Sequence, residues 1–209
     1  MGGGLGIRHH GGEPHVPLAE YARALGEAVA REAERSRIPL PRLMVEPGRS
    51  IIGPAGWTLY TVGSIKDVPG IRRYVAVDGG MGDNPRVALY QAVYEATVAN
   101  KAARERTEVV SVAGKCCETG DMLIWDARLQ PVEPGDILAV HATGAYNYSM
   151  ASNYNRLPRP AVVLVGYGRS DVLVRRETYE DLVRFDVIPE RLAKPVSRGQ
   201  AAGRAAGDD

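Results

Sequence analysis

The sequence predicts an α/β segment in the first quarter of the chain and an all-β domain after it. Residues 17–36 carry apolar side chains at steps of three and four residues, which is the period of an amphipathic helix. From Thr58 onward, short runs of β-branched and aromatic residues recur between turn signals, as in a β-sandwich or barrel. The 209 residues are 44 % hydrophobic and 24 % charged, which are ordinary values for a globular protein.

The first 56 residues read as a loop, a helix and a buried strand. Residues 1–15 are rich in Gly and His and are expected to form the loop. The helix over 17–36 stops before two prolines, which disfavour helical backbone in the residues before them. The apolar run 43–45 then leads into a Glu-Pro-Gly turn, the pattern of a buried strand that ends in a loop. This order is typical of an α/β unit.

Residues 57–190 are expected to form the β domain. Pro69-Gly70 and Pro134-Gly135-Asp136 mark turns. Helices are expected over 88–103 and 178–184, and residues 191–209 are expected to be a disordered tail. The runs expected to form strands are 58–68, 71–77, 108–112, 122–125, 137–141 and 161–167.

Charge and composition exclude several classes of protein. The chain has 26 basic and 25 acidic residues, which gives no reason to expect a nucleic acid or an anionic membrane as partner. No apolar run approaches the ~18 residues of a membrane span, and the Gly-rich start is unlike a signal peptide. The two adjacent cysteines form neither a disulfide framework nor a metal-ligand pattern. We therefore expect a cytoplasmic protein without a metal site.

Two motifs of the first segment are typical of a phosphate site. The consecutive glycines of Gly2–Gly6 allow backbone N–H groups to approach a phosphate, although a flexible stretch would look the same. Glu46-Pro47-Gly48-Arg49 places a carboxylate, a tight turn and a guanidinium at the end of the expected strand. Phosphate sites of α/β barrels often lie in the loops after the last two strands. The alternative for the second motif is a surface turn whose arginine faces solvent.

Three motifs of the β domain carry further candidate residues. In the Gly- and Asp-rich segment 78–86, Arg86 is suited to bind a carboxylate, with Tyr90 one helical turn away. In segment 114–121, the thiol of Cys117 lies beside Glu118, a combination suited to proton donation next to substrate recognition, although both cysteines would also fit a core. Segment 143–155 holds three tyrosines and three asparagines, which suits a ligand-facing loop or a solvated turn.

These five motifs, in this order, strongly resemble the diaminopimelate decarboxylases. The diaminopimelate decarboxylases are pyridoxal-phosphate enzymes of the alanine racemase-like barrel class, related to the ornithine and arginine decarboxylases. The resemblance runs from Gly2 to about Pro189, and Glu118 after Cys117 resembles the diaminopimelate branch, since the ornithine enzymes have Asp there. It implies the carboxy-terminal portion of a (β/α)8 TIM barrel that binds pyridoxal 5'-phosphate, followed by a β-sandwich or barrel domain. The implied reaction converts meso-2,6-diaminopimelate into L-lysine and carbon dioxide.

The resemblance also implies a role for each matching residue. Gly4 and the Pro47-Gly48-Arg49 turn bind the cofactor phosphate, and Glu46 faces the pyridine nitrogen. The implied substrate contacts are Arg49, the carboxylate-binding pair Arg86 and Tyr90, Glu118 at the distal ammonium, and Tyr146, which also touches the cofactor. Cys117 is the implied catalytic acid, which gives a proton after carbon dioxide leaves. The Cys-Glu loop comes from a second subunit in this family, so a homodimer with shared sites is implied.

One part of the family pattern is missing. None of the four lysines, Lys66, Lys101, Lys115 and Lys194, matches the context of the cofactor-anchoring lysine, which lies on an earlier barrel strand in the family. A complete barrel needs ~250 residues, so residues 1–56 have room for two of its eight α/β units. We therefore expect a truncated chain that is inactive alone. The alternatives are a non-catalytic, cofactor-free relative that binds an intact decarboxylase, and a decarboxylase of ornithine or arginine.

Overall fold

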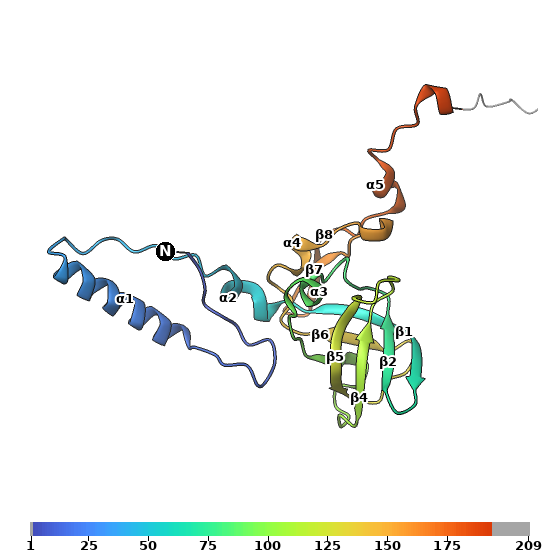
Figure 1. The fold of residues 1–209 in the computed structure, drawn as a ribbon, viewed down its shortest axis with the longest axis horizontal. Helices are drawn as coiled ribbons and strands as arrows, with labels where there is room; N and C mark the ends of the chain where they lie inside the picture. The colour runs from blue at the N-terminus through green and yellow to red at the C-terminus, as the bar shows by residue number, and fades with distance from the viewer. Residues whose placement is uncertain (1, 194–209) are drawn as a thin grey trace, which may run out of the picture.

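The computed structural model describes residues 2–193, and these residues form a curved β domain with an extended N-terminal arm (Figure 1). The arm contains the helix α1 (Leu18–Arg35) and the loops on both sides of it. It joins the β domain through the short helix α2 (Gly48–Ile52) and the 3₁₀ turn η1 (Gly53–Ala55). The helix predicted over 17–36 is confirmed, and so is the predicted loop over its described residues 2–15.

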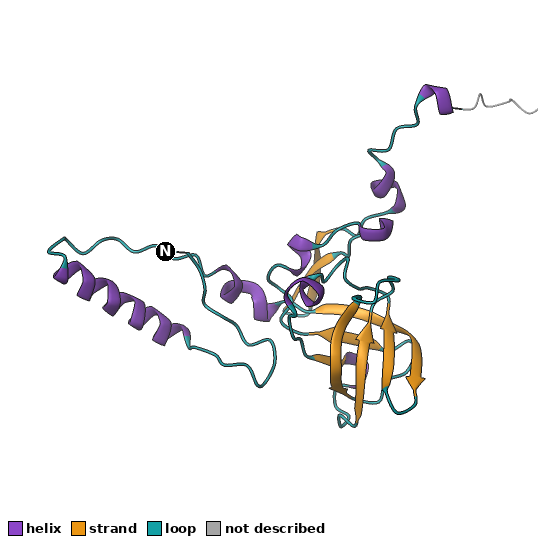
Figure 2. Ribbon diagram, viewed as in Figure 1, coloured by secondary structure: helices purple, strands orange, loops and turns teal. Residues whose placement is uncertain are grey.

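A six-stranded sheet forms the body of the β domain, and it curves until it nearly closes into a barrel (Figure 2). Its strand order is β3-β6-β1-β2-β4-β5, with β2 and β4 parallel and the other neighbours antiparallel. At the open seam, the N–H of Val98 in β3 donates to the side chain of Gln130 just after β5, at 3.1 Å. The bounds are β1 (Thr58–Val68), β2 (Arg72–Val77), β3 (Ala96–Val98), β4 (Glu108–Ala113), β5 (Met122–Leu129) and β6 (Ile137–Val140).

The hairpin between β1 and β2 forms where the sequence predicts it. The N–H of Ile71 donates to the carbonyl of Val68 at 3.0 Å, and Gly70 has φ +70°, a conformation that glycine adopts without strain. This turn sets the antiparallel register in which Val68 faces Arg72 and Ile65 faces Val75. The predicted turn and both strands are confirmed.

One hydrophobic core fills the inside of the curved sheet. Alternate residues of the strands point inward, so the side chains that face the core are almost entirely excluded from solvent. Burying one such Val or Leu side chain contributes about 1.5–3 kcal/mol to folding. The largest fully buried apolar residues are Val62, Val75, Val98, Val110, Val112, Leu123, Leu129, Leu138 and Val140.

A smaller hairpin and several short helices lie at one end of the sheet. The strands β7 (Val162–Gly166) and β8 (Arg169–Val174) pair with each other and lead to α5 (Tyr179–Val183) and η4 (Glu190–Leu192). The short helices α3 (Arg86–Tyr90), α4 (Asn147–Met150) and η3 (Tyr154–Arg156) lie at this end, whereas η2 (Ala99–Lys101) lies beside the start of β6. The helix predicted over 178–184 is confirmed as α5, which Thr178 caps.

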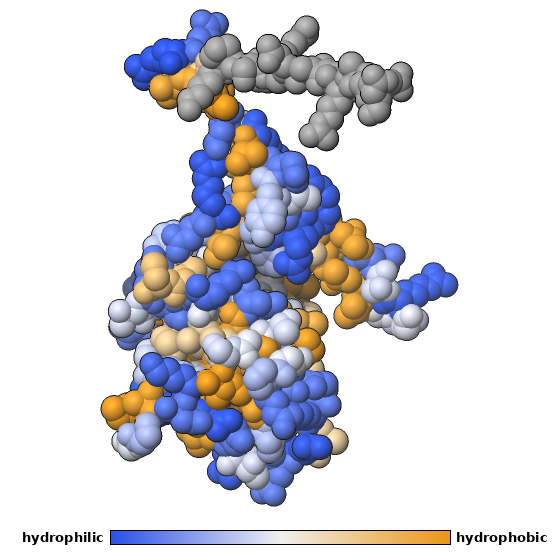
Figure 3. All heavy atoms as spheres, turned by 90° about the vertical axis from the view of Figure 1, so that its right-hand side faces the viewer, coloured by the Kyte–Doolittle hydropathy of each residue, from blue (hydrophilic) through white to orange (hydrophobic). Residues whose placement is uncertain are grey.

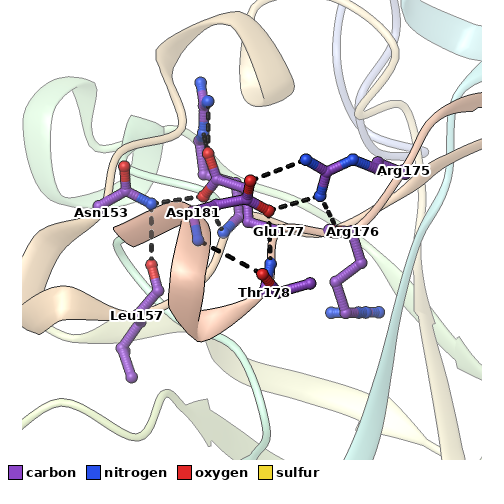
Figure 4. A network of polar contacts seen from close by, with 8 residues as sticks. Asn153, Leu157, Arg175, Arg176, Glu177, Thr178 and Asp181 are labelled. Atoms are coloured by element: carbon purple, nitrogen blue, oxygen red, sulfur yellow. Dashed lines mark hydrogen bonds and ion pairs between the residues drawn. The ribbon is translucent and has the colours of Figure 1, made fainter. Parts of the chain in front are cut away.

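Polar contacts fasten the chain after β8 to the loop before β7 (Figure 4). The carboxylate of Glu177 binds the guanidinium of Arg159 at 2.6 and 2.8 Å and the amide of Asn153 at 2.5 Å. Next to it, Thr178 and Asp181 form a capping box, and Arg175 binds the Asp181 carboxylate. These contacts hold the start of α5 against the loop that contains Asn153.

The structure corrects two predicted elements. The helix predicted over 88–103 is wrong, because α3 ends at Tyr90, Gln91 has a left-handed backbone, and β3 follows. The β-branched residues Thr97 and Val98 pair with β6, and this pairing outweighs the helical pattern. The buried strand predicted over 43–45 is also wrong here: Leu43 and Val45 are exposed. A parallel strand needs strands on either side, and no strand of residues 2–193 pairs with this segment.

The other strand predictions are confirmed, with small shifts at their ends, while β3 and β8 were not predicted. None of the helices in residues 2–193 is long and apolar enough to cross a membrane. Residues 194–209, which include most of the tail predicted to be disordered, lie outside the described residues.

Candidate functional site

The glycine loop and the Glu46–Arg49 turn lie side by side, as expected for a shared site. The N–H of Glu46 donates to the carbonyl of Gly2 at 3.3 Å. A Cβ atom at Gly3 would collide with the carbonyl oxygen of Glu46, so only glycine fits there. Gly4 has φ +101°, which is also a conformation suited to glycine. The two segments, more than forty residues apart, therefore meet through glycine backbone.

The side chains around this turn fit an anionic group such as a phosphate. Nε of Arg49 is buried and has no hydrogen-bond partner in the described part of the chain. A Cβ placed at Gly48 would lie 3.7 Å from the hydroxyl oxygen of Tyr146, so this tyrosine borders the turn. An unpaired guanidinium N–H beside glycine backbone supplies the donors that a phosphate accepts.

Tyr146 lies between two arginines that the sequence places far apart. Cζ of Arg49 is 5.3 Å from the centre of its ring, and Cζ of Arg86 is 5.6 Å from it. Both distances are within the range of cation–π attraction. Tyr146 itself has φ +73°, a conformation uncommon for a tyrosine, directly before α4. The ring thus connects the Glu46–Arg49 turn with Arg86.

Arg86 is a buried guanidinium without an acidic partner. Its side chain packs over the ring of Tyr90, with Cζ 5.3 Å from the ring centre, and Nε donates to the hydroxyl of Tyr94 at 3.1 Å. The residue is 8 % exposed, and none of the ion pairs among residues 2–193 includes it. Burying a guanidinium is costly unless an anion compensates its charge. The arrangement therefore fits a ligand carboxylate.

The loop between β4 and β5 carries the thiol and carboxylate that the sequence singled out. Cys117 is exposed, whereas Cys116 is half-buried, and burial together with the nearby Asp121 raises the pKa of the Cys116 thiol. Cys117 is therefore the accessible thiol of the adjacent pair.

Only one of the two carboxylate oxygens of Glu118 has a hydrogen-bond partner among the described residues. One of its carboxylate oxygens accepts a hydrogen bond from the hydroxyl of Tyr154, and the other oxygen is buried without a partner among the residues described. This hydrogen bond lowers the pKa of Glu118 and raises the pKa of Tyr154 to about 12. Glu118 is thus an ionised acceptor, and its unused oxygen fits a donor such as an ammonium group.

A small pocket lies where this loop meets the segment 79–83. Tyr60 donates to the Asp83 carboxylate at 2.5 Å, and burial raises the pKa of both groups. The N–H of Lys115 donates to the carbonyl of Gly79 at 3.0 Å, which joins the two loops. Tyr60, Asp83, Lys115 and Cys116 all line the pocket.

The candidate residues therefore form two groups. The first contains the Glu46–Arg49 turn, Tyr146, Arg86 and Tyr90, and the second contains Cys117 and Glu118. Across the described chain, no hydrogen bond, ion pair or ring contact joins the two groups. Nor do residues 2–193 hold three His, Cys, Asp or Glu side chains placed to bind a metal ion.

Two tyrosines that contact these groups, Tyr94 and Tyr154, were not among the residues predicted for the site. Tyr94, which binds Arg86, lay inside the helix predicted over 88–103 and gave no signal of its own. Tyr154, which binds Glu118, belonged to the Tyr- and Asn-rich segment that was predicted to face a ligand. That density of tyrosine was the available signal, but the sequence does not show which carboxylate a given tyrosine meets.

Comparison with known proteins identifies related domains over most of the chain. Residues 36–144 match the family described as pyridoxal-dependent decarboxylase, C-terminal sheet domain, and residues 1–53 match its pyridoxal binding domain. Diaminopimelate decarboxylase of Bacillus subtilis is 57 % identical over 187 residues, which cover 90 % of this chain and 43 % of that protein. The Synechocystis enzyme is 53 % identical over 192 residues, covering 92 % of this chain and 41 % of the relative.

Solved structures give the same picture. Diaminopimelate decarboxylase from M. jannaschii, in complex with L-lysine, matches with a TM-score of 0.84 and 36 % identity, covering 92 % of this chain and 43 % of that one. The enzyme from Helicobacter pylori, also complexed with L-lysine, has a TM-score of 0.76 and 33 % identity, over 88 % and 43 % of the two chains. The chain thus spans less than half the length of these relatives.

Proposed function

Since the chain belongs to the pyridoxal-dependent decarboxylase family, we propose that the full-length protein carrying it is a diaminopimelate decarboxylase. It removes carbon dioxide from meso-2,6-diaminopimelate and releases L-lysine, with pyridoxal 5'-phosphate as cofactor. The relatives named diaminopimelate decarboxylase, at 57 % and 53 % identity, support this substrate.

The observation that carries the proposal is the buried guanidinium of Arg86, which has no acidic partner among residues 2–193. Diaminopimelate has a carboxylate and an ammonium at each end, and one of its carboxylates remains in the product. Arg86, with Tyr90 and Tyr146 packed on its guanidinium, binds the retained carboxylate. This contact supplies the charge that the burial of Arg86 otherwise lacks.

Glu118 supplies the complementary charge for the distal ammonium. Its buried, partnerless oxygen accepts the ammonium, while Tyr154 keeps the carboxylate oriented and ionised. Cys117, exposed next to it, holds the proton that goes to the carbon atom from which carbon dioxide has left. Ornithine and arginine lack the distal carboxylate, so they would leave Arg86 unpaired.

The cofactor is held by the first group of residues. Backbone at Gly4, the Pro47-Gly48 turn and the guanidinium of Arg49 bind its phosphate, Glu46 faces its pyridine nitrogen, and Tyr146 contacts the cofactor from the side of Arg86. Bound there, pyridoxal phosphate supplies an electron sink for decarboxylation. In this proposal residues 1–56 belong to a TIM barrel that holds the cofactor, and residues 57–190 form a separate β domain.

A homodimer completes the site. The two groups of residues do not touch within one described chain, so the Cys117–Glu118 loop reaches the site of a second subunit. Two-fold dimers are the commonest symmetric assemblies, and in them each subunit gives the other the same loop. We place this enzyme in the cytoplasm, because its two adjacent cysteines are not those of a disulfide framework.

The test is a substrate panel with the purified full-length protein and added pyridoxal phosphate. Carbon dioxide release is measured with meso-diaminopimelate, L-ornithine and L-arginine. Preferential release from diaminopimelate supports the proposal. Preference for ornithine or arginine would move the protein to another branch, and release from none of the three would favour a non-catalytic relative.

A further inference from the structure

A buried carboxylate lies between the loop that carries Cys117 and Glu118 and the segment that leads into Arg86. Asp121 stands directly before β5 and is only 3 % exposed. One of its oxygens, Oδ1, accepts the backbone N–H of Met81 at 2.6 Å. The other oxygen, Oδ2, accepts the backbone N–H of Cys116 at 2.7 Å. Each oxygen therefore serves a different loop.

Both loops present glycine to this carboxylate. A Cβ atom at Gly80 would lie 2.6 Å from Oδ1 of Asp121, and one at Gly114 would collide with the same carboxylate. Backbone bonds close the arrangement, since the N–H of Gly114 donates to the carbonyl of Asp121 at 2.8 Å and Lys115 donates to Gly79 at 3.0 Å. The two loops thus pack around the carboxylate at the closest approach that backbone allows.

Stability alone does not explain an aspartate at this place. None of the salt bridges of residues 2–193 includes Asp121, so its charge is compensated by backbone N–H groups. Burying a carboxylate carries a desolvation penalty that an apolar residue avoids. A buried polar group of this kind is better understood as a device that fixes one geometry.

We propose that Asp121 is a positioning residue for the decarboxylase site. It fixes the loop that carries Cys117 and Glu118 relative to segment 79–84, which leads into Arg86. Asp121 does not itself touch the substrate. The inference rests on the proposed function, since Asp121 then sets how the loop with the proton donor Cys117 projects from its own subunit toward the partner's site, and it ties that loop to the segment before Arg86, which serves the other site of the dimer.

The substitution Asp121→Asn tests this role with little change in side-chain shape. Two N–H donors face two acceptor oxygens, and an asparagine has nearly the same shape but only one acceptor. In Asp121→Asn, one loop keeps its hydrogen bond and the other meets an NH₂ group that also donates. The variant therefore releases one loop from the other without opening a cavity.

The experiment compares full-length wild type with Asp121→Asn and with the control Asp67→Asn, an exposed aspartate whose one ion pair within residues 2–193 is with Arg73. Rates are normalised to bound cofactor, measured by its absorbance, so that a loss of folded protein does not count. We expect Asp121→Asn to raise KM for diaminopimelate and to lower kcat, with kcat/KM reduced about 10²-fold, the usual scale for misplaced catalytic groups. Asp67→Asn should match wild type, and so should the cofactor absorbance of both variants.

Hydrogen exchange gives a second readout that does not need activity. In Asp121→Asn, amides in 79–82 or 114–118 should exchange faster than in wild type, and those of the core strand β4 should not. If this variant does not fold, Gly80→Ala replaces it, since its Cβ displaces the carboxylate from one loop, and the same kinetic change is expected. Wild-type kcat and KM in the folded variant would overturn the inference. A wild-type protein inactive on diaminopimelate would instead contradict the proposed function.

Discussion

At the scale of single residues, the site depends on charges that the chain leaves unmatched. Within residues 2–193, Arg86 is buried against two tyrosine rings without an acidic partner, and Glu118 has one oxygen that accepts a hydrogen bond and one that does not. In a folded core such groups are costly, so their presence together points to a ligand that carries both charges. Diaminopimelate has this combination at its distal end.

Arg86→Gln in the full-length protein removes the guanidinium charge and keeps a side chain of similar polarity. We expect kcat/KM for diaminopimelate to fall about 10- to 10³-fold, because a charge-assisted contact with a carboxylate is lost. Steady-state kinetics measure this, with the exposed Arg128→Gln as the matched control. Equal loss in both variants would argue against a specific carboxylate contact.

Tyr154→Phe tests the state of Glu118. The Tyr154 hydroxyl lowers the pKa of Glu118, and the ammonium contact needs the ionised form. Removing the hydroxyl raises this pKa, so the loss of kcat/KM on acidification should begin at a higher pH than in wild type. The measurement is a pH profile, and Tyr167→Phe, at a fully exposed hairpin turn, serves as control. An acid limb that stays in place would contradict this role of Tyr154.

Sequence motifs predicted part of the contacts between single residues. Glycines, Glu-Pro-Gly-Arg and Cys-Glu are local patterns, and the meeting of the Gly2–Gly6 loop with Glu46 agrees with them. Asp121 and Tyr154 contact residues 40 and 36 positions away, at Met81 and Glu118, and Tyr94 reaches Arg86 only because the chain turns after α3, so no local pattern specifies these contacts.

At the scale of elements, most strands follow from alternation of apolar residues and from turn residues. β1 and β2 formed as predicted because Pro69-Gly70 fixes the hairpin register. The segment 88–103 was predicted to be a helix but contains the strand β3. Its β-branched residues pair with β6, and no local pattern reveals that partner. Pairing between distant segments is thus where the element predictions failed.

Glu177 provides a test of how much the polar contacts of the segment after β8 stabilise the fold. Its contacts with Arg159 and Asn153 lower the pKa of Glu177 from 4.5 to about 2 (Figure 4). A lowered carboxylate pKa means stability that is present above the unfolded pKa and is lost as the pH falls through the folded one. Glu177→Gln should therefore destabilise the protein by about 1.5–3 kcal/mol at pH 7.

Urea unfolding at several pH values measures this change. The difference between wild type and Glu177→Gln should shrink as the pH falls from 4.5 to about 2, because the wild-type carboxylate then becomes protonated. The exposed Glu105→Gln is the control and should cost little at any pH. A difference that is independent of pH would show that the Glu177 charge does not stabilise the fold.

At the scale of the whole molecule, the β domain has its own core, and the other segments within residues 2–193 do not. Ala33 is the one buried residue of α1, and the β7–β8 hairpin and the segment after α5 expose many apolar side chains (Figure 3). Examples are Val165, Phe185, Val187 and Ile188. Exposed apolar patches of this extent are surfaces that pack against another part of a protein or against a partner, or that cause aggregation.

We therefore expect the 209-residue chain alone to aggregate or to remain partly unfolded. Size-exclusion chromatography and a thermal scan measure this, with the full-length protein as comparison. A soluble monomer with a single cooperative unfolding transition would contradict the expectation.

In the proposed enzyme, Arg86, Glu118 and Cys117 belong to sites that decarboxylate diaminopimelate. This is measured by incubating the full-length protein and pyridoxal phosphate with meso-2,6-diaminopimelate and quantifying both products. We expect L-lysine and carbon dioxide in equal amounts. Failure to form either product, from a folded protein that has bound its cofactor, would contradict this expectation.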